Sequence, residues 1–237
     1  MIEPALFHVE ETLSTNDDLK KAVSRTENKL FICETADKQR LGRGRSGKSF
    51  VSDKGGIYFS FTLPLSGKEK NIPFLTLLTG LVVCLEIRKV TCLDVKIKWP
   101  NDLYLNGRKI CGILTELISA GEKITAIAGV GINNEKTDFP QELKDSAACL
   151  VDFGAVIEDK DAFIKAVTQK VYSLVYEENA LDCTDKYAAL IRELSYSVGK
   201  DCEYCGRTGK ILDINDDGSV KIEFDDGIRD VFSGVVT

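Results

Sequence analysis

The spacing of apolar residues changes near Ser195, and this change limits the possible folds more than any other feature. Before it, strand-like runs alternate with helical segments, as in a domain that combines helices with a sheet. After it, helical spacing disappears and short strand-like runs are separated by glycines, which is typical of a small antiparallel barrel. We therefore expect an α+β fold with a larger domain over residues 1–190 and a small barrel over 191–237.

Within the larger domain, periodicity predicts three helices. The first begins at Ser14 or Thr15 in "STNDDLKKAV", with Asp17 or Asp18 closing a capping box. The other two are "IPFLTLLTGLVVCLEIRKV" and "KDAFIKAVTQKVYSLVYEE". Alternating or apolar runs predict strands in "KLFICETA", "GGIYFSFTLPL", "DVKIKWP" and "KITAIAGVGINN", and a hairpin in "DLYLNGRKICGILTEL".

Composition argues against several classes of partner. The 237 residues carry a net charge of −6, which disfavours a general nucleic-acid or anionic-membrane surface. The most apolar run, "FLTLLTGLVVCLEI", is too short to cross a bilayer and contains Glu86. No charged-then-apolar leader opens the sequence, so we expect a cytoplasmic protein.

The eight cysteines are typical of a reduced protein, because most lie singly in apolar segments. Cys202 and Cys205 form the one CxxC, but a zinc site needs a second pair of ligands and His8 is the only histidine. We interpret them as strand cysteines, with redox or metal use as the alternative. "DINDDGSVKIEF" resembles a calcium loop, but Phe224 stands where a bidentate Glu is needed, so we expect a hairpin turn.

Residues 38–48 concentrate positive charge in an acidic protein: five cations, three of them arginines, surround three glycines. Glycines let the backbone approach a ligand, and arginines match the geometry of phosphate and carboxylate. The segment therefore predicts a flexible clamp for an anion, with a disordered basic loop as the alternative. Its spacing matches neither the phosphate loop nor the dinucleotide fingerprint.

A second dense segment is "KIKWPNDLYLNGRKICG". Its polar and charged residues bracket a strand end and a hairpin whose turn, Asn106-Gly107, suits type I′ geometry. Taken alone it could be a charged turn anchored by Trp99, the only tryptophan. Likewise, Asn133 in "GVGINN" could lie beside a ligand or end a buried strand.

The order of these segments resembles the biotin protein ligases over nearly the whole chain: "STN", "QRLGRGRSGK", "KWPNDL", "GRKICGIL", "GVGIN" and a small barrel. The resemblance implies a central mixed or antiparallel sheet with flanking helices, of the class II synthetase type, and a C-terminal SH3-like barrel. It also implies activation of biotin by ATP with Mg²⁺, followed by transfer to a lysine of a biotin carboxyl carrier domain, and it is compatible with a homodimer.

Each matching residue inherits an expected role. Residues matching the biotin-binding set are Ser14, Thr15, Asn16, Gln39, Arg43, Gly44, Arg45 and Lys109. Residues matching the ATP and adenylate set are Arg45, Phe50, Asn101, Asp102, Lys109 and Asn133. Residues expected to take part in the chemistry are Lys109, Arg43, Arg45 and Asp102; the resemblance assigns no metal ligand.

The sequence departs from the family at three loop positions. Ser46 and Lys48 stand where arginines are usual, and Phe50 stands where tryptophan is usual, which leaves less charge and less stacking area for the adenylate. No winged helix precedes the matching region, so we expect no repressor role. The alternatives are a lipoate or octanoate ligase of the same fold, whose usual motifs are missing here, and a non-catalytic biotin or nucleotide sensor.

Overall fold

The larger unit is built on a seven-stranded mixed sheet. The computed structural model describes residues 4–25, 31–120 and 123–232. The sheet order is β1-β2-β3-β7-β6-β5-β4, with β1 and β2 parallel and every other pair antiparallel. Its strands are β1 (Ala5–Thr12), β2 (Ile32–Gln39), β3 (Ile57–Leu65), β4 (Lys96–Lys98), β5 (Asp102–Leu105), β6 (Arg108–Ala120) and β7 (Lys123–Ile132). The mixed sheet expected from the resemblance is confirmed.

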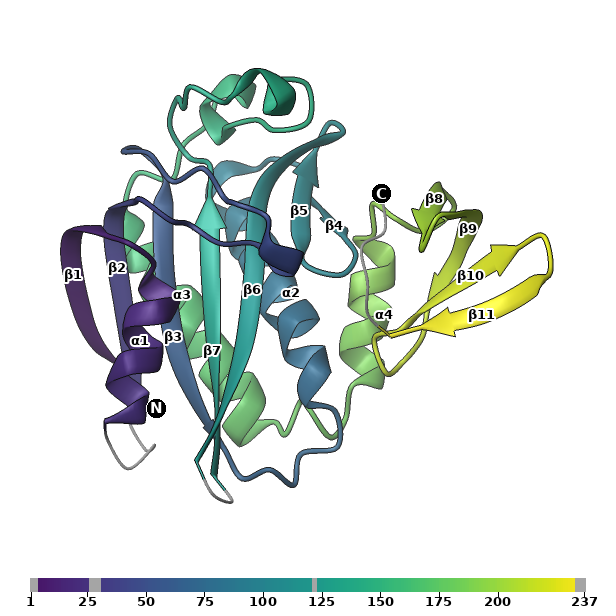
Figure 1. Ribbon diagram of the computed structural model, residues 1–237, viewed down its shortest axis with the longest axis horizontal. Helices are drawn as coiled ribbons and strands as arrows, with labels where there is room; N and C mark the ends of the chain where they lie inside the picture. The colour runs from purple at the N-terminus through teal and green to yellow at the C-terminus, as the bar shows by residue number, and fades with distance from the viewer. Residues whose placement is uncertain (1–3, 26–30, 121–122, 233–237) are drawn as a thin grey trace.

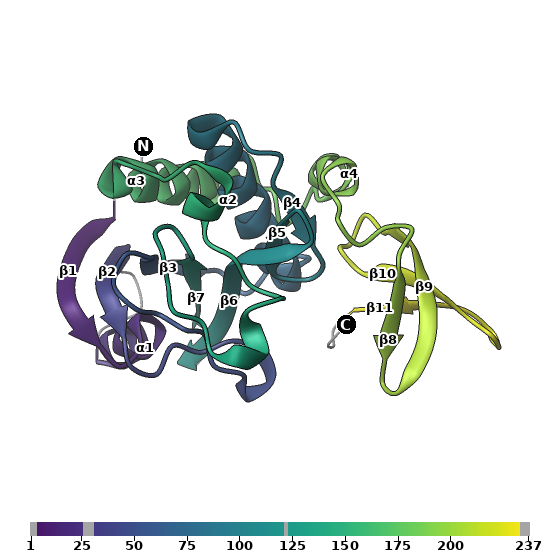
Figure 2. The same ribbon diagram turned by 90° about the horizontal axis from the view of Figure 1, so that it is seen from above.

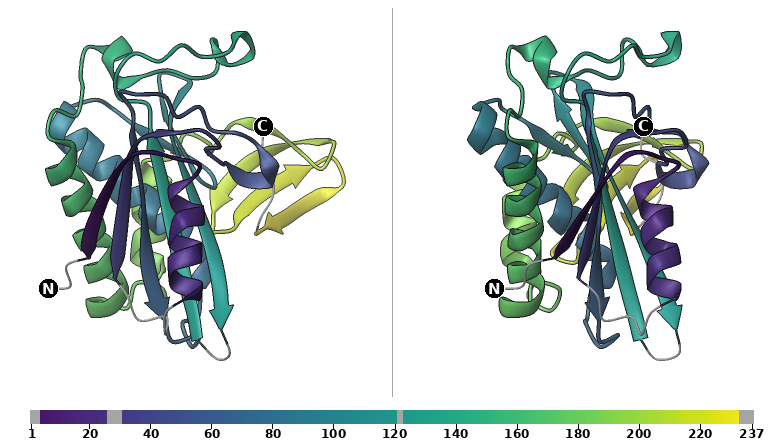
Figure 3. Two further views of the ribbon diagram at one scale, coloured as in Figure 1. Left: turned by 60° about the vertical axis from the view of Figure 1, so that its left-hand side comes forward. Right: turned by 90° about the vertical axis from the view of Figure 1, so that its left-hand side faces the viewer.

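Helices cover both faces of this sheet (Figures 1 and 2). One face packs against α2 (Leu75–Thr91) and α3 (Lys160–Tyr172), the latter continued by a π-helical turn, η5 (Ser173–Glu177). The opposite face carries α1 (Thr15–Ser24), as the edge-on view in Figure 3 shows. The part of α2 up to Cys84 is buried on nearly every side and is mostly apolar, whereas Glu86, Arg88 and Lys89 lie in its last turns.

The start of α1 follows from the sequence. Ser14 is the N-cap, and its side chain accepts a hydrogen bond from the backbone N–H of Asp17. The two carboxylates that were candidates to close a capping box form ion pairs: Asp17 pairs with Lys20 (3.3 Å) and Asp18 pairs with Lys21 (3.1 Å). Leu19 of this helix is buried against the sheet.

The C-terminal part forms a four-stranded antiparallel sheet in the order β11-β10-β9-β8, beyond α4 (Asp185–Glu193). Its strands are β8 (Asp201–Tyr204), β9 (Arg207–Ile214), β10 (Val220–Phe224) and β11 (Gly227–Val231). The indole N–H of Trp99 donates to the Gly218 carbonyl (2.8 Å) in the turn between β9 and β10. This hydrogen bond therefore attaches the small sheet to the residue that directly follows β4.

Most predicted elements are present, and the differences have simple causes. The Asn106-Gly107 turn has positive φ at both residues (47° and 82°), as type I′ geometry requires. The pattern did not reveal β1 or α4, because β1 is an exposed edge strand with no buried face and α4 has only nine residues. Cys202 lies buried in β8, but Cys205 lies exposed in the turn after it, so the prediction of two strand cysteines is half right.

The remaining short helices are one-turn segments in the connections: η1 (Arg45–Gly47), η2 (Ile72–Phe74), η3 (Gln141–Leu143) and η4 (Leu150–Phe153). The segment with η3 and η4 arches over one end of the sheet at the top of Figure 1. All eight cysteines are free thiols. Among the described residues, no helix is both long and apolar enough to cross a membrane.

Candidate active site

A cavity of about 400 Å³ lies on the face of the sheet that carries α1. Its walls come from the start of α1, the segment after β2, the ends of β4 to β7 and the arching segment. All twelve residues singled out from the sequence line it: Ser14, Thr15, Asn16, Gln39, Arg43, Gly44, Arg45, Phe50, Asn101, Asp102, Lys109 and Asn133. Its size is suited to small ligands or cofactors.

One end of the cavity is a buried polar network. Gln39 Oε1 accepts from the backbone N–H and the hydroxyl of Thr15 (3.0 and 3.2 Å). The Thr15 hydroxyl lies 2.6 Å from Ser60 Oγ, which donates to Asn16 Oδ1 (2.6 Å). Asn16 Nδ2 donates to Glu116 Oε2 (2.9 Å). These bonds fix donors and acceptors before a ligand arrives, which favours a small ligand with polar edges.

Glycines on the central strands keep the floor of this cavity low. A Cβ on Gly129 would lie 2.1 Å from Asn16 Oδ1, so any side chain there would collide with the polar network. A Cβ on Gly131 would lie 2.7 Å from the ring of Phe50. The two glycines are alternate residues of β7 and therefore face the same side. Gly129 thus lies beneath the polar network, and Gly131 lies beneath the ring of Phe50.

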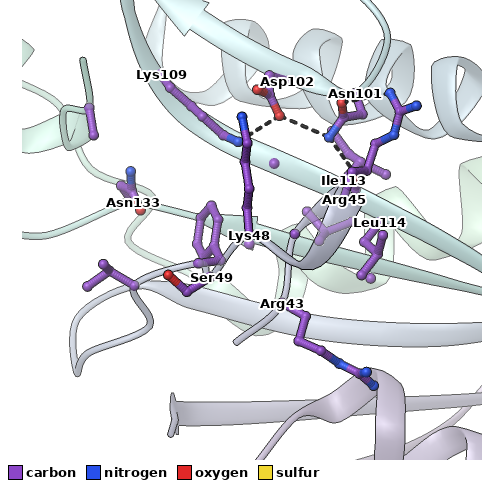
Figure 4. Close-up of a pocket in the computed structure, with 18 of the residues that line it drawn as sticks. Arg43, Arg45, Lys48, Ser49, Asn101, Asp102, Lys109, Ile113, Leu114 and Asn133 are labelled. Carbon is purple, nitrogen blue, oxygen red and sulfur yellow. Dashed lines mark hydrogen bonds and ion pairs between the residues drawn. The ribbon is translucent and has the colours of Figure 1, made fainter. Parts of the chain in front are cut away.

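At the opposite end, Lys109 and Asp102 form an ion pair (Nζ to Oδ1, 2.7 Å). Asn101 Nδ2 also donates to this carboxylate oxygen (3.0 Å), and the guanidinium of Arg45 reaches Asn101 Oδ1 (3.4 Å). Burial lowers the pKa of Arg45, and nearby Asp102 partly opposes that shift. Figure 4 shows these four side chains gathered at one edge of the sheet. They combine two cations with one carboxylate, so an anionic ligand can supply the missing negative charge.

A β-bulge orients Lys109 toward the cavity. Asp102 pairs with Gly112 and Tyr104 with Lys109, so the ladder between β5 and β6 contains one extra residue in β6. Ile110 and Cys111 both point into the core, at 0% exposure each. Lys109 and Gly112 therefore lie on the same face, although regular alternation would separate them.

The glycine-arginine segment is folded into a compact turn. Gly44 N–H donates to Lys48 O (2.7 Å), and Phe50 N–H donates to Gly42 O (2.8 Å). Arg43 forms an ion pair with Asp17 of α1 and points away from Lys109 in Figure 4. Two of the predicted arginines are therefore separated: Arg45 joins the Lys109 cluster, and Arg43 fastens the segment to α1.

Phe50 and Asn133, which are both expected to lie near the nucleotide, have different surroundings. The Phe50 ring lies 5.7 Å from Lys109 Nζ, where it forms a cation–π contact. Asn133 follows β7 directly and is 3% exposed, with Nδ2 donating to Ala148 O (3.1 Å). That bond attaches the arching segment to the end of the strand. Phe50 is thus free to present a ring face, whereas the Asn133 amide is partly used in holding the cavity wall.

Several lining residues were not picked out as site residues from the sequence. Ser60 carries no motif, since it is one polar residue inside an apolar strand, yet it is 0% exposed and central to the network. In the sequence, Lys98 and Tyr104 are only part of a charged segment, whereas in the structure they line the cavity together with Asp102. The glycines of "GVG" could have been found from their spacing, because alternate strand residues share a face.

Comparison with known proteins agrees with this arrangement. Residues 9–133 match the model of the biotin/lipoate A/B protein ligase family. The bifunctional ligase/repressor BirA of Bacillus subtilis (strain 168) is 32% identical over 210 residues, which are 84% of this chain and 63% of that protein. The biotin--[acetyl-CoA-carboxylase] ligase of Mycobacterium tuberculosis is 25% identical over 81% of this chain and 71% of that protein.

The fold is also similar to that of solved structures. A biotin protein ligase from Aquifex aeolicus, in complex with biotin and ATP, superposes with a TM-score of 0.82 at 29% identity, covering 98% of this chain and 97% of that one. By contrast, the chain spans only 63% of the length of the Bacillus relative.

Proposed function

The chain belongs to the biotin/lipoate A/B protein ligase family, and from this premise we propose that it activates biotin with ATP and transfers the biotinyl group to a lysine of a carrier domain. The observation that carries the proposal is a single cavity with a pre-organised polar network at one end and the Lys109–Asp102 pair at the other. A ligand with a polar ring and a distant carboxylate fits both ends.

Biotin has those two features. Its ureido ring offers two N–H donors and one carbonyl acceptor, which the side chains of Thr15, Asn16 and Gln39 can match. Its valeryl carboxylate would then point toward Lys109. Lipoate, the alternative substrate, has an apolar dithiolane ring that would leave this buried network unsatisfied, at a cost of about 1–3 kcal/mol per group.

In the first step, a biotin carboxylate oxygen attacks the α-phosphorus of ATP. A new O–P bond forms, the bond to the α,β-bridging oxygen breaks, and pyrophosphate leaves with the electron pair. Negative charge grows around the α-phosphorus, where the ammonium of Lys109 and the guanidinium of Arg45 would stabilise it. Phe50 would provide a ring face for adenine, and Asn133 would border the nucleotide.

The lining residues fit a magnesium ion that arrives bound to ATP. Among the described residues, no group of three Asp, Glu, His or Cys side chains could hold a metal, and Asp102 is the carboxylate of the cavity wall. Mg²⁺ commonly binds through one or two carboxylates plus substrate phosphates. When bound, it would neutralise phosphate charge, with Asp102 and the side-chain oxygen of Asn101 as its protein ligands.

In the second step, the acceptor lysine attacks the acyl carbon of biotinyl-AMP, and AMP leaves. The attacking amine must be neutral, and Asp102, which lines the cavity, would take its proton. The glycine-arginine segment, held on one side by Arg43 and on the other by Arg45, would cover the reactive anhydride and keep water from it.

Other expectations extend this proposal. We place the catalytic domain at residues 1–190 and the small C-terminal domain at 191–237, with its barrel closure a prediction. The acceptor would be a biotin carboxyl carrier domain of a carboxylase. We expect a cytoplasmic protein that binds no nucleic acid and no membrane, and a homodimer is compatible with the family.

Biotin-dependent exchange between ATP and labelled pyrophosphate tests the activity. We expect exchange with biotin and at least 100-fold less with lipoate at equal concentration. Exchange with lipoate but not with biotin would show that lipoate is the substrate. Tight biotin binding with no exchange would instead identify a non-catalytic sensor.

A further inference from the structure

We propose that Lys98 and Tyr104 form a binding site for the pyrophosphate leaving group, that is, for the β- and γ-phosphates of ATP. This inference rests on the proposed function, which it deepens by naming the groups that hold the departing anion. Neither residue was assigned a role from the sequence. Both line the cavity beside Asp102.

The register of the sheet places these residues on the reacting face. Lys98 of β4 lies directly opposite Asp102 of β5, and Tyr104 lies directly opposite Lys109 of β6. Residues directly opposite one another share a face, as do residues two apart on one strand. Lys98, Asp102, Tyr104 and Lys109 therefore form one continuous patch. Lys109 is at one side of it, and Lys98 extends it toward the C-terminal sheet.

Lys98 differs from its neighbouring lysines in having no carboxylate partner among the residues that the structure describes. Lys109 pairs with Asp102 (2.7 Å) and Lys96 pairs with Asp94 (3.3 Å). Within the described residues, Lys98 takes part in no ion pair. An ammonium group that lines a cavity without a counter-ion is suited to an anionic ligand.

Tyrosine rings hold this ammonium in place. Lys98 Nζ lies 4.9 Å from the centre of the Tyr104 ring and donates to its hydroxyl (3.3 Å). Tyr104 in turn stacks on Tyr196 with ring centres 4.9 Å apart. The ring that contacts Lys98 is therefore itself supported, and this contact favours a position of the ammonium at the cavity.

Tyr104 adds a second donor. Its oxygen accepts the hydrogen bond from Lys98, so its own O–H proton is available for another acceptor. The ammonium and the hydroxyl together match a phosphate oxygen pair, and both stabilise the charge that pyrophosphate gains as it leaves.

The test compares Lys98→Met with Lys96→Met, a matched control on the same strand whose amine does not line the cavity. In the exchange assay we expect Lys98→Met to raise the KM for pyrophosphate and for MgATP at least about 10-fold, the loss of one hydrogen bond between charged groups. The KM for biotin should change less than 2-fold. Tyr104→Phe should raise the pyrophosphate KM about 3-fold, and Lys98→Arg should restore most of the affinity.

Transfer of biotin from biotinyl-AMP, the second half-reaction, distinguishes pyrophosphate binding by Lys98 from a structural role. When biotinyl-AMP is supplied, no pyrophosphate takes part, so Lys98→Met should transfer biotin to a carrier domain at the wild-type rate. Equal losses in both half-reactions, or a wild-type KM for pyrophosphate in Lys98→Met, would overturn the inference.

The inference can fail separately from the proposed function. If the wild-type protein shows no biotin-dependent exchange, the proposed function fails. Calorimetric titration with inorganic pyrophosphate then still decides the binding site, since Lys98→Met should bind it at least 10-fold more weakly than wild type. Equal binding would contradict the site.

Discussion

At the scale of single residues, Lys109 is the strongest test of the chemistry. Its ammonium pairs with Asp102 at the edge of the cavity and packs no core. We predict that Lys109→Ala lowers the rate of biotin-dependent exchange by about 10²–10³-fold, the loss typical of one donor to a developing charge. The melting temperature should change little. Arg108→Ala is the control, because that side chain stacks on Phe153 outside the cavity; exchange at the wild-type rate in Lys109→Ala would remove this lysine from the mechanism.

The two glycines of β7 should separate the halves of the substrate. In Gly129→Ala the new methyl group meets Asn16, so we predict a KM for biotin raised roughly 10-fold, since overpacking costs about 1–3 kcal/mol. In Gly131→Ala the methyl group meets Phe50, and the KM for MgATP should rise instead. Steady-state exchange with each substrate varied in turn measures both. If each variant changed the KM for biotin and the KM for MgATP equally, the cavity would not be divided into a biotin part and an ATP part.

Glu34 should make stability depend on pH. Burial, followed by repulsion from Asp18, raises its pKa to about 7 from an ordinary 4.5, with Lys21 opposing. The folded state therefore holds the proton more tightly than the unfolded state, and stability falls as pH rises from about 4.5 to 7. We predict that the melting temperature of Glu34→Gln, measured relative to that of wild type, increases as pH rises from 5 to 8. Glu10→Gln, on the exposed edge strand, is the control; a constant difference across that range would rule out Glu34 as the cause.

At the scale of elements, the glycine-arginine segment should act as a cover. Arg45 attaches it to Asn101, so Arg45→Gly should still form biotinyl-AMP but release it. We predict at least about 10-fold more biotin on bystander lysines of albumin, because a lost hydrogen bond that involves one charged group costs about 1.5–3 kcal/mol. Arg40→Ala is the control, since Arg40 pairs with Glu11 outside the cavity. Unchanged albumin labelling, with adenylate still made, would show that the segment does not retain it.

The sequence predicted which residues meet around this cavity better than it predicted the surrounding elements, while the roles of those residues stay predictions. The twelve residues lie in short motifs whose order is specific, whereas β1 and α4 lack the periodic burial that pattern analysis needs. Ser60 could not be found, since its role depends on Thr15 and Asn16 reaching it across 44 or 45 residues of chain. The departure of Arg43 toward α1 also required the structure, because no spacing rule indicates which of two arginines faces a ligand.

At the scale of the whole molecule, the C-terminal sheet is braced against the site. Trp99 donates to Gly218, and a Cβ on Gly218 would lie 2.7 Å from Phe74 and 3.0 Å from Leu77. We predict that Gly218→Ala displaces this turn, lowers the melting temperature by several degrees and reduces exchange, although the residue does not line the cavity.

Gly206→Ala is the matched control for that variant. Gly206 has a similar φ (73° against 85°), but a Cβ added there would meet no atom within 4 Å, so this variant measures backbone strain alone, about 1–2 kcal/mol. Differential scanning calorimetry and the exchange assay measure both variants. Equal losses in the two would show that strain, and not the contact with α2 and Trp99, accounts for the effect.

The bulge at Ile110 has a consequence for how this site can be lost or inherited. Two core residues, Ile110 and Cys111, separate Lys109 from Gly112, and the bulge lets both of them point inward while the lysine faces the cavity. If the ladder became regular with both residues kept, the lysine would turn toward the core. If one of the two were deleted, the lysine would lie two places from the glycine and would still face the cavity. Alignments of such chains should therefore allow a one-residue gap between this lysine and the glycine, since hairpins of either length can present the same amine.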